Sequence, residues 1–164
     1  MAETGAASKS ERLGFNPERG GVHNARTIML AELDALLAQF AADDAKWPAY
    51  RRAIIEENRL GKPSGVSRRL TARHLRALYG LDPAIPIFRG LLFFWRREPE
   101  DRPLLAMLAA VARDPLLRLS AEFVLGKAAG EEVSAADLGE LMGRISVLLR
   151  FSVVIAGLFP DKVV

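Results

Sequence analysis

Apolar residues recur at intervals of three and four along most of this chain, and this periodicity limits the fold to packed helices. The clearest case covers residues 24–41, where Asn24 is a suitable N-cap residue. The apolar positions of that segment are Ile28, Leu33, Leu36, Leu37 and Phe40. They fall on one side of a helix, so we predict a helix here with its apolar side against a core.

Proline and glycine divide the following residues into segments of helical length. Pro48 suits the first turn of a helix that we expect to end between Asn58 and Leu60. Ser67 is expected to cap the next helix, which ends at Gly80. Further helices are predicted over residues 87–97, from Pro103, from Pro115 up to Gly126 or Gly130, and over residues 134–144, where Ser134 is the cap.

The predicted fold is all-α, a compact bundle of six to seven short helices. With 164 residues the chain fits one domain, which we place at residues 23–144. A flexible N-terminal lead over residues 1–22 precedes it, and an apolar tail of irregular or β-prone character over residues 145–164 follows it. Two other places are compatible with strand structure, the aromatic segment 87–97 and the connection 61–66.

Composition excludes several classes of chemistry. The chain has no cysteine, so disulfides, thiolate metal sites and cysteine nucleophiles are absent. Its two histidines, His23 and His74, have no partners at the spacing of a metal site or a catalytic base. We therefore expect no cofactor, no metal, no small-molecule substrate and no enzymatic activity.

The sequence also favours a cytoplasmic protein without a membrane partner. Residues 1–24 are polar and lack the apolar segment of a secretory signal. The longest apolar run covers residues 145–159 and is interrupted by Arg150. It is shorter than the ~20 residues that a membrane-spanning helix needs.

Residues 61–65, Gly-Lys-Pro-Ser-Gly, share only part of the pattern of a phosphate-binding loop. A Walker loop has a glycine five residues before its Gly-Lys pair and a serine or threonine directly after the lysine. This chain has Glu56 and Pro63 at those positions. We interpret the segment as a turn that ends one helix and orients the next.

Positive charge is concentrated in one part of the chain. Residues 45–80 hold nine Lys or Arg against two acids, a local charge of +7, whereas the whole chain carries +3. On a helix over residues 67–79 the four arginines share one arc, and the leucines lie opposite. With the lysine of the preceding turn these arginines are the predicted nucleic-acid-binding set: Lys62, Arg68, Arg69, Arg73 and Arg76.

Two interpretations of this basic helix are open. No acid occurs between Glu57 and Asp82 to relieve repulsion between arginines such as Arg69 and Arg73, which favours an anionic partner, double-stranded DNA first. Four or five phosphate contacts would make log K fall against log salt concentration with a slope of about −4. A solvated surface, or a face that docks an acidic protein, is the alternative.

The helices on either side of residues 61–66 also have the outline of a helix-turn-helix, although a connection of about six residues is longer than the usual three or four. A second pattern, in residues 88–98, combines four aromatic side chains with arginines, as in platforms that stack single-stranded bases. We interpret these aromatics as core and expect Arg96 and Arg97 to extend the basic surface.

Three segments carry a resemblance to a known family. They are AIIEENRLGKPSGVSRRLTARHLRALYGLDP at residues 53–83, IFRGLL at residues 87–92 and RPLLAMLAAVARDPLLRLSAEFVL at residues 102–125. In this combination the chain resembles the BrxA family of BREX phage-defence systems over roughly residues 20 to 140. The matching residues are Glu57 and Asn58, Lys62, Ser67 to Arg69, and Asp114 to Leu117. The tail from Ile145 departs from the family pattern.

The resemblance implies a small, mainly helical, non-enzymatic component with a fold similar to NusB-type antitermination factors. It further implies DNA binding and action beside the BREX methyltransferase and other BREX subunits. Two alternative functions remain: a scaffold that docks an acidic subunit of the same defence complex, and an RNA-binding NusB-like factor.

Overall fold

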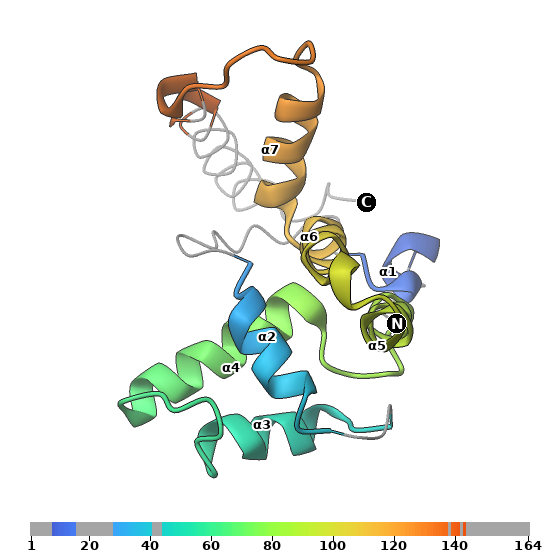
Figure 1. Cartoon of the computed structure of the whole chain (residues 1–164), viewed down its shortest axis with the longest axis vertical. Coiled ribbons are helices and arrows are strands. Elements are labelled where there is room, and N and C mark those ends of the chain that lie inside the picture. The colour runs from blue at the N-terminus through green and yellow to red at the C-terminus, as the bar shows by residue number, and fades with distance from the viewer. Residues whose placement is uncertain (1–7, 16–27, 41–43, 138, 142, 144–164) are drawn as a thin grey trace, which may run out of the picture. The chain divides into compact units, whose positions relative to one another are not determined.

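The computed structural model describes residues 8–15, 28–40, 44–137, 139–141 and 143. Every regular element within these residues is helical, which confirms the all-α prediction and rules out strands at residues 61–66 and 87–97. The elements are α1 (Lys9–Leu13), α2 (Leu30–Leu37), α3 (Trp47–Ile55), α4 (Gly65–Tyr79), α5 (Pro86–Arg97), the 3-10 turn η1 (Pro99–Asp101), α6 (Arg102–Arg113) and α7 (Pro115–Leu125) (Figure 1).

The chain divides into two compact units, Met1–Leu117 and Arg118–Val164. The described part of the first unit holds α1 to α6 and the start of α7, and the second holds the rest of α7 and helical residues between 135 and 143. The sequence pattern predicted one domain over residues 23–144, whereas the structure divides that range after Leu117. The predicted tail, residues 145–164, lies outside the described residues.

Proline lies in the first turn of four of the described α-helices, α3, α5, α6 and α7. Pro48 of α3, Pro86 of α5 and Pro103 of α6 occupy positions whose N–H would have no helical acceptor. Asp114 begins the next helix, because its Oδ1 accepts hydrogen bonds from the backbone N–H groups of Leu116 and the following residue at 2.8 and 3.1 Å. The Asp-Pro pair at 114–115 therefore separates α6 from α7, as the sequence predicted.

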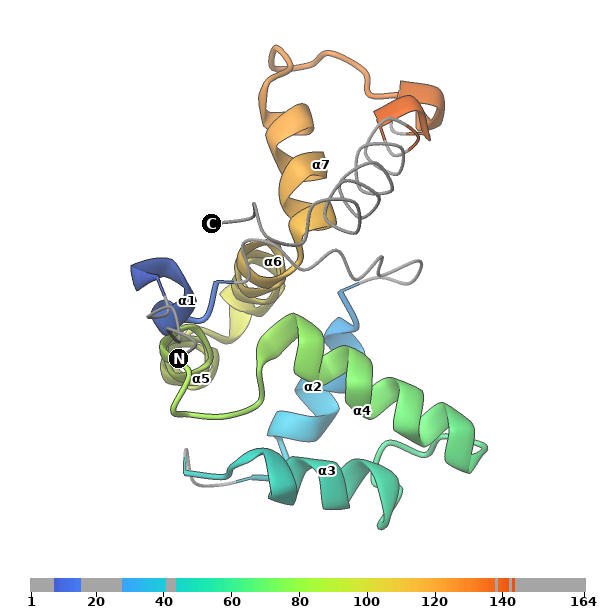
Figure 2. The ribbon, with the colours of Figure 1, turned by 180° about the vertical axis from the view of Figure 1, so that it is seen from behind.

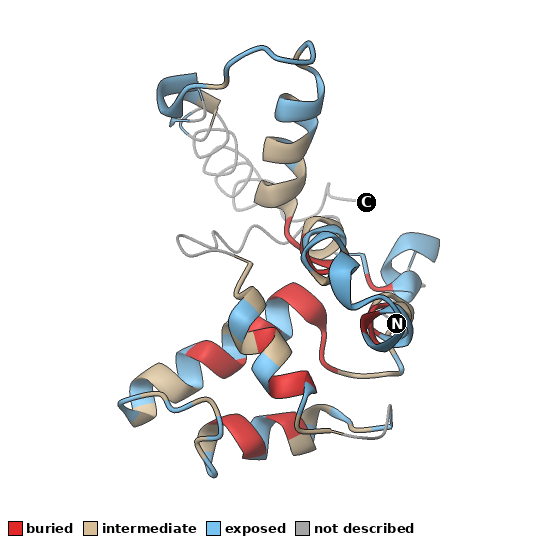
Figure 3. Ribbon diagram, in the orientation of Figure 1, coloured by how far each residue is buried: buried red, intermediate tan, exposed pale blue. Residues whose placement is uncertain are grey.

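The helices of the first unit surround one core. Helix α4 packs against α3 and α6, α5 packs against α6, and α2 lies beside α3 in both views (Figure 1, Figure 2). Buried and exposed stretches alternate along α3 and α4, as expected for helices with one covered side (Figure 3). The largest fully buried side chains are Tyr50, Tyr79, Phe88, Leu33, Leu36, Ile54, Leu75 and Leu81.

Tyr79 joins the end of α4 to the residues before α2. Its ring is fully buried, and its hydroxyl donates a hydrogen bond to the carbonyl oxygen of Ile28. Burial raises the pKa of this phenol, and the negative charge of Glu32 raises it further. The hydroxyl therefore stays protonated and satisfies a half-buried backbone carbonyl.

Two predicted helix ends differ from the structure. The helix predicted from Asn24 begins at Leu30 instead, after Met29 in a left-handed conformation with φ of 50°; Asn24 itself lies outside the described residues. Helix α3 ends at Ile55, before the predicted 58–60, and Asn58 adopts a left-handed φ of 49° that stops helical continuation.

The predicted N-cap of α4 is wrong, whereas its predicted end is confirmed. Ser64 is the cap, and its Oγ accepts a hydrogen bond at 3.1 Å from the backbone N–H of Ser67 inside the first turn. Gly80 ends the helix with a φ of 85°, a conformation that favours glycine. A Cβ added there would lie 2.8 Å from Cδ1 of Ile85, so the Ile85 side chain would have to shift to admit one.

The predicted N-terminal lead contains a helix, α1. The Oγ of Ser8 accepts a hydrogen bond from the N–H of Glu11 at 3.2 Å, and the carboxylate of Glu11 accepts one from the N–H of Ser8 at 2.7 Å. This reciprocal pair is a capping box, the Ser-x-x-Glu pattern of a helix start. Residues 9–13 of the predicted flexible lead are therefore helical.

The second unit repeats such capping. The Oγ of Ser134 accepts a hydrogen bond from the backbone N–H of Asp137 at 3.0 Å, and the carboxylate of Asp137 accepts one from the N–H of Ser134 at 3.0 Å. The predicted cap at Ser134 is therefore confirmed. None of the helices in the described ranges is long and apolar enough to cross a membrane.

Candidate nucleic-acid interface

Helix α4 has one covered side and one exposed side. Its buried residues are Thr71, Ala72, Leu75, Leu78 and Tyr79. Arg69, Arg73 and Arg76 are exposed, and their spacing of four and three residues places them on one face of the helix. These three residues, which we call the arginine face, are the part of the predicted binding set that the structure brings together.

Arg68, predicted to join that face, is half-buried on the covered side. Its Nη1 donates a hydrogen bond to the carbonyl oxygen of Ile55 at 2.9 Å, at the end of α3. Leu70, predicted to be covered, is 39% exposed. The predicted covered side was centred on the leucines. Ala72 and Tyr79 are buried as well, so the observed covered side includes the position of Arg68.

Lys62, the remaining member of the predicted set, forms an ion pair with α2. Its Nζ lies 2.9 Å from Oε1 of Glu32, and the two side chains are only 24% and 28% exposed. The hydrogen bond from Lys62 lowers the pKa of Glu32, and burial opposes this only in part. Lys62 therefore fastens the α3–α4 connection to α2, and its charge is neutralised locally.

Three other arginines of the basic segment also have acidic partners. The ion pairs are Arg51–Glu56 at 3.1 Å, Arg52–Glu57 at 3.3 Å and Arg59–Glu57. The two acids between residues 45 and 80 thus neutralise arginines of α3 and of the turn after it. No acid in the described part of the chain pairs with the arginine face.

The arginine face borders a pocket of about 370 Å³, which we call the Trp47 pocket. The lining residues are Trp47, Ile55, Arg69, Ala72, Arg73, Arg76, Ala77 and Arg113. The guanidinium carbon of Arg76 lies 4.7 Å from the ring centroid of Trp47, within the range of a cation–π interaction. Cationic and aromatic side chains therefore share one cavity between α3, α4 and α6.

Arg113 reaches this pocket from the end of α6. Its Nε donates a hydrogen bond to the carbonyl oxygen of Ala77 at 3.0 Å, and its Nη1 donates one to the carbonyl oxygen of Gly14 at 2.8 Å. Burial lowers the pKa of the guanidinium, and the positive charge of Arg76 lowers it further. Arg113 and Arg76 therefore repel each other across the pocket.

Sequence reasoning missed both Trp47 and Arg113 as members of this site. Trp47 was visible only as the residue before a helix-starting proline, and its position beside the arginines depends on how α3 packs on α4. Arg113 lies 37 residues after Arg76 in the chain. No local pattern connects them, because they meet through the packing of α6 on α4.

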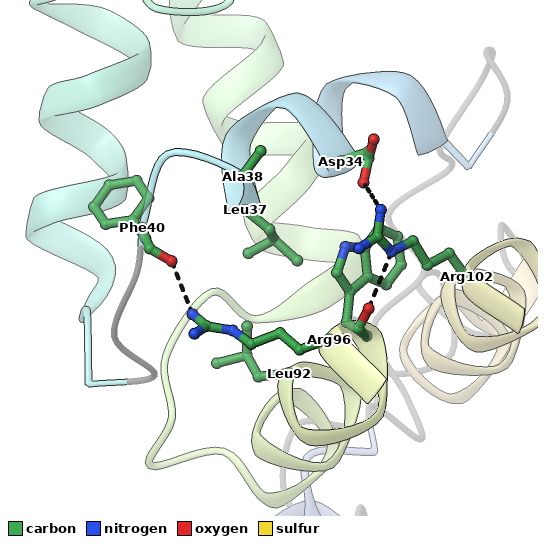
Figure 4. A pocket seen from close by; sticks show the side chains of 8 residues that line it. Asp34, Leu37, Ala38, Phe40, Leu92, Arg96 and Arg102 are labelled. Carbon is green, nitrogen blue, oxygen red and sulfur yellow. Dashed lines mark hydrogen bonds and ion pairs between the residues drawn. The ribbon is translucent and has the colours of Figure 1, made fainter. Parts of the chain in front are cut away.

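A second pocket, of about 310 Å³, contains Arg96 and Arg102 (Figure 4). Arg102 Nη1 lies 2.9 Å from Oδ1 of Asp34, and its Nε donates a hydrogen bond to the carbonyl oxygen of Trp95 at 3.0 Å. Arg96 Nη2 donates one to the carbonyl oxygen of Phe40 at 2.8 Å. These guanidiniums join α5 and α6 to α2 and the residues after it, so we interpret them as structural.

The aromatic segment of α5 is only partly core. Phe88 and Trp95 are buried, as predicted, whereas Phe93 and Phe94 are 48% and 47% exposed. The guanidinium carbon of Arg97 lies 3.7 Å from the ring centroid of Phe93, and its Nη1 donates a hydrogen bond to the carbonyl oxygen of the same residue at 2.8 Å. Arg97 therefore covers its own helix and does not extend the arginine face.

The connection between α3 and α4 covers residues 56–64. It is longer than the six residues predicted, and longer still than the three or four of a helix-turn-helix. His74 is half-buried on α4, and no group of three or more side chains suited to a metal ion occurs among the described residues. The arginine face and the Trp47 pocket are therefore the features with the clearest chemistry.

Comparisons of this chain with protein-family models, with curated proteins and with solved structures found no match.

Proposed function

We propose that this chain is a non-catalytic nucleic-acid-binding protein whose arginine face contacts the backbone phosphates of double-stranded DNA. The supporting observation is that Arg69, Arg73 and Arg76 share an exposed face and have no acidic partner among the described residues. A guanidinium is positively charged at every physiological pH and donates two parallel hydrogen bonds to a phosphate.

The spacing of the arginine face suits one DNA strand. Arg69 and Arg76 are seven residues apart, which is about 10 Å along a helix that rises ~1.5 Å per residue. One strand of B-DNA carries a phosphate about every 3.4 Å along its axis, so about three phosphates fall within that length. We therefore count one phosphate contact for each of the three guanidiniums.

The proposed contact set is smaller than the five residues predicted from the sequence. Lys62 is neutralised by Glu32, and Arg68 is bonded to the end of α3, so both have local roles. With three contacts the expected slope of log K against log salt concentration is about −2.7, less steep than the −4 expected for the larger set, since each phosphate contact contributes about −0.9.

The likeness to the BrxA family leads us to propose further that this binding takes place in a bacterial phage-defence complex, in the cytoplasm and beside a methyltransferase subunit. This proposal is supported by the motif at Glu57 and Asn58, Lys62, and Ser67 to Arg69. The last residue of the motif, Arg69, is the first residue of the arginine face. Within the motif, Lys62 and Arg68 hold α4 against α2 and α3, so its basic residues position the helix that carries the arginine face.

Fluorescence anisotropy with a labelled 20-base-pair duplex tests the proposal. The double variant Arg73→Ala and Arg76→Ala removes two of three contacts, so we expect affinity at low salt to fall by about tenfold or more. The matched control is Arg51→Ala, which removes one positive charge from the neighbouring helix where Glu56 already pairs with it. This control should bind within about twofold of the unaltered protein.

Other outcomes separate the alternative functions. Failure of the unaltered protein to bind the duplex at low salt would refute the proposal. Tighter binding to an RNA duplex or single-stranded RNA of the same length would favour the NusB-like alternative. Loss of a co-purifying acidic protein on changing Arg73 and Arg76, with duplex affinity unchanged, would favour the scaffold.

A further inference from the structure

The Trp47 pocket differs in shape from the arginine face that borders it. It is an open depression of about 370 Å³, at the lower end of the ~300–1,000 Å³ range of small-ligand sites. A whole DNA duplex, whose major groove alone is about 12 Å wide, is too large to fill this depression, although its backbone can contact the arginines at the rim. The pocket therefore suits a group that inserts from a strand end or from solution, about the size of one nucleotide.

The charge of the pocket points to a doubly charged anion. Four guanidiniums line it, from Arg69, Arg73, Arg76 and Arg113, and the lining includes no acid. Hydrogen bonds to the carbonyl oxygens of Ala77 and Gly14 hold Arg113 in place despite its repulsion by Arg76. A phosphate monoester carries about −1.5 to −2 charges at pH 7 and would relieve this repulsion more than a singly charged backbone diester would.

The apolar part of the pocket points to a ring attached to that phosphate. Ile55, Ala72, Ala77 and the Trp47 ring supply apolar surface beside the guanidiniums. Nucleobases stack on aromatic rings and on the planes of arginine guanidiniums. The pair formed by Arg76 and Trp47 offers both kinds of surface in one place.

We propose that the Trp47 pocket binds a nucleoside phosphomonoester, with the phosphate among the four guanidiniums and the base against the Trp47–Ile55 side. This inference rests on the proposed nucleic-acid binding and specifies its ligand: a phosphorylated strand end or a free mononucleotide, which share this chemistry. Arg69, Arg73 and Arg76 belong both to the arginine face and to the pocket lining, so a terminal phosphate occupies the guanidiniums that a backbone phosphate occupies on an unbroken duplex.

The test compares two DNA hairpins with the fluorophore in the loop, identical except that one has a 5′-phosphate and the other a 5′-hydroxyl. We expect the phosphorylated hairpin to bind about tenfold tighter. The preference should shrink to about twofold or less in Trp47→Leu and in Arg73→Ala, each checked for folding by circular dichroism. Arg51→Ala, which changes a paired arginine outside the pocket, should keep the full preference.

Competition identifies the source of the ligand. If adenosine 5′-monophosphate displaces the labelled hairpin at concentrations similar to those at which the phosphorylated hairpin binds, the ligand is a free nucleotide. If only phosphorylated strands displace it, the ligand is a strand end. Inorganic phosphate that competes as well as adenosine 5′-monophosphate would overturn the role of the base.

A closed circular duplex, which has no ends, separates this inference from the proposed function. Equal binding of the two hairpins, with the circular duplex still bound, overturns the pocket inference and leaves the arginine face intact. A strong 5′-phosphate preference without binding to the circular duplex supports the pocket and contradicts duplex binding. Absence of binding to all three DNAs overturns both.

Discussion

At the residue scale, Arg68 and Arg69 are neighbours in the sequence but their guanidiniums have different surroundings. Arg68 reaches the carbonyl oxygen at the end of α3, whereas Arg69 lines the Trp47 pocket. The role of Lys62 is likewise set by a residue distant in the sequence, because its ion-pair partner Glu32 lies 30 positions earlier in the chain. Charge counts along the sequence identified the basic segment, but only tertiary contacts separate its structural cations from its exposed ones.

The Lys62–Glu32 pair makes a prediction about stability and pH. Because the pKa of Glu32 is lowered in the folded protein, the pair stabilises the fold fully above the unfolded carboxyl pKa of about 4.3. The contribution disappears as pH falls through the lower folded-state pKa. We expect Lys62→Met to lower the free energy of unfolding by about 1 kcal/mol at pH 7, and the difference from the unaltered protein to vanish toward pH 2.

Urea unfolding at pH 7, 5, 3 and 2 measures this difference. Arg51→Met is the control, because its pair with Glu56 is half exposed on both sides and such pairs contribute little. A Lys62→Met effect that stayed constant across these pH values would show that the loss comes from packing of the lysine chain and not from the ion pair.

At the element scale, most helices were predictable because their starts and ends are local chemistry. Pro48, Pro103 and the Asp114–Pro115 pair mark helix starts, and Gly80 marks an end, all within a few residues of the groups they affect. The cap of α4 was not predictable in this way. Ser64 and Ser67 both precede the buried apolar residues of α4, and only the extended backbone of Ser64 decides between them.

The two serines give a matched pair of substitutions. We expect Ser64→Ala to lower the free energy of unfolding by about 1 kcal/mol, because the N–H of Ser67 loses its acceptor. Ser67→Ala keeps the backbone N–H and should change stability by less than about 0.5 kcal/mol. Thermal or urea unfolding of both variants measures the difference, and a larger loss for Ser67→Ala would contradict the assignment of the cap.

At the scale of the whole molecule, the all-α class followed from the periodicity, whereas the Trp47 pocket did not. The pocket needs α3, α4 and the end of α6 to meet, and Trp47, Arg73 and Arg113 lie far apart in the chain. The division after Leu117 could not be predicted from the sequence either, because residues 115–125 have the pattern of one ordinary helix. Local patterns therefore predicted elements, and long-range packing determined the site.

The distribution of paired and unpaired charges over the molecule also depends on this packing. The chain carries a net charge of only +3, too little by itself to indicate a nucleic-acid partner. Glu32, Glu56 and Glu57 pair with the structural cations of the basic segment, and no described acid pairs with the arginine face. Positive charge is thereby concentrated on one exposed helix face and the adjoining pocket.

The central claim, that the arginine face binds duplex DNA through three phosphates, is tested most directly by the salt dependence of affinity. Anisotropy titrations from about 50 to 200 mM salt should give a slope of log K against log salt near −2.7 for the unaltered protein and near −1.8 for Arg73→Ala. Lys62→Met should keep the unaltered slope, because Glu32 already neutralises that lysine. A slope near zero for the unaltered protein, or a slope that Lys62→Met reduces as much as Arg73→Ala does, would contradict it.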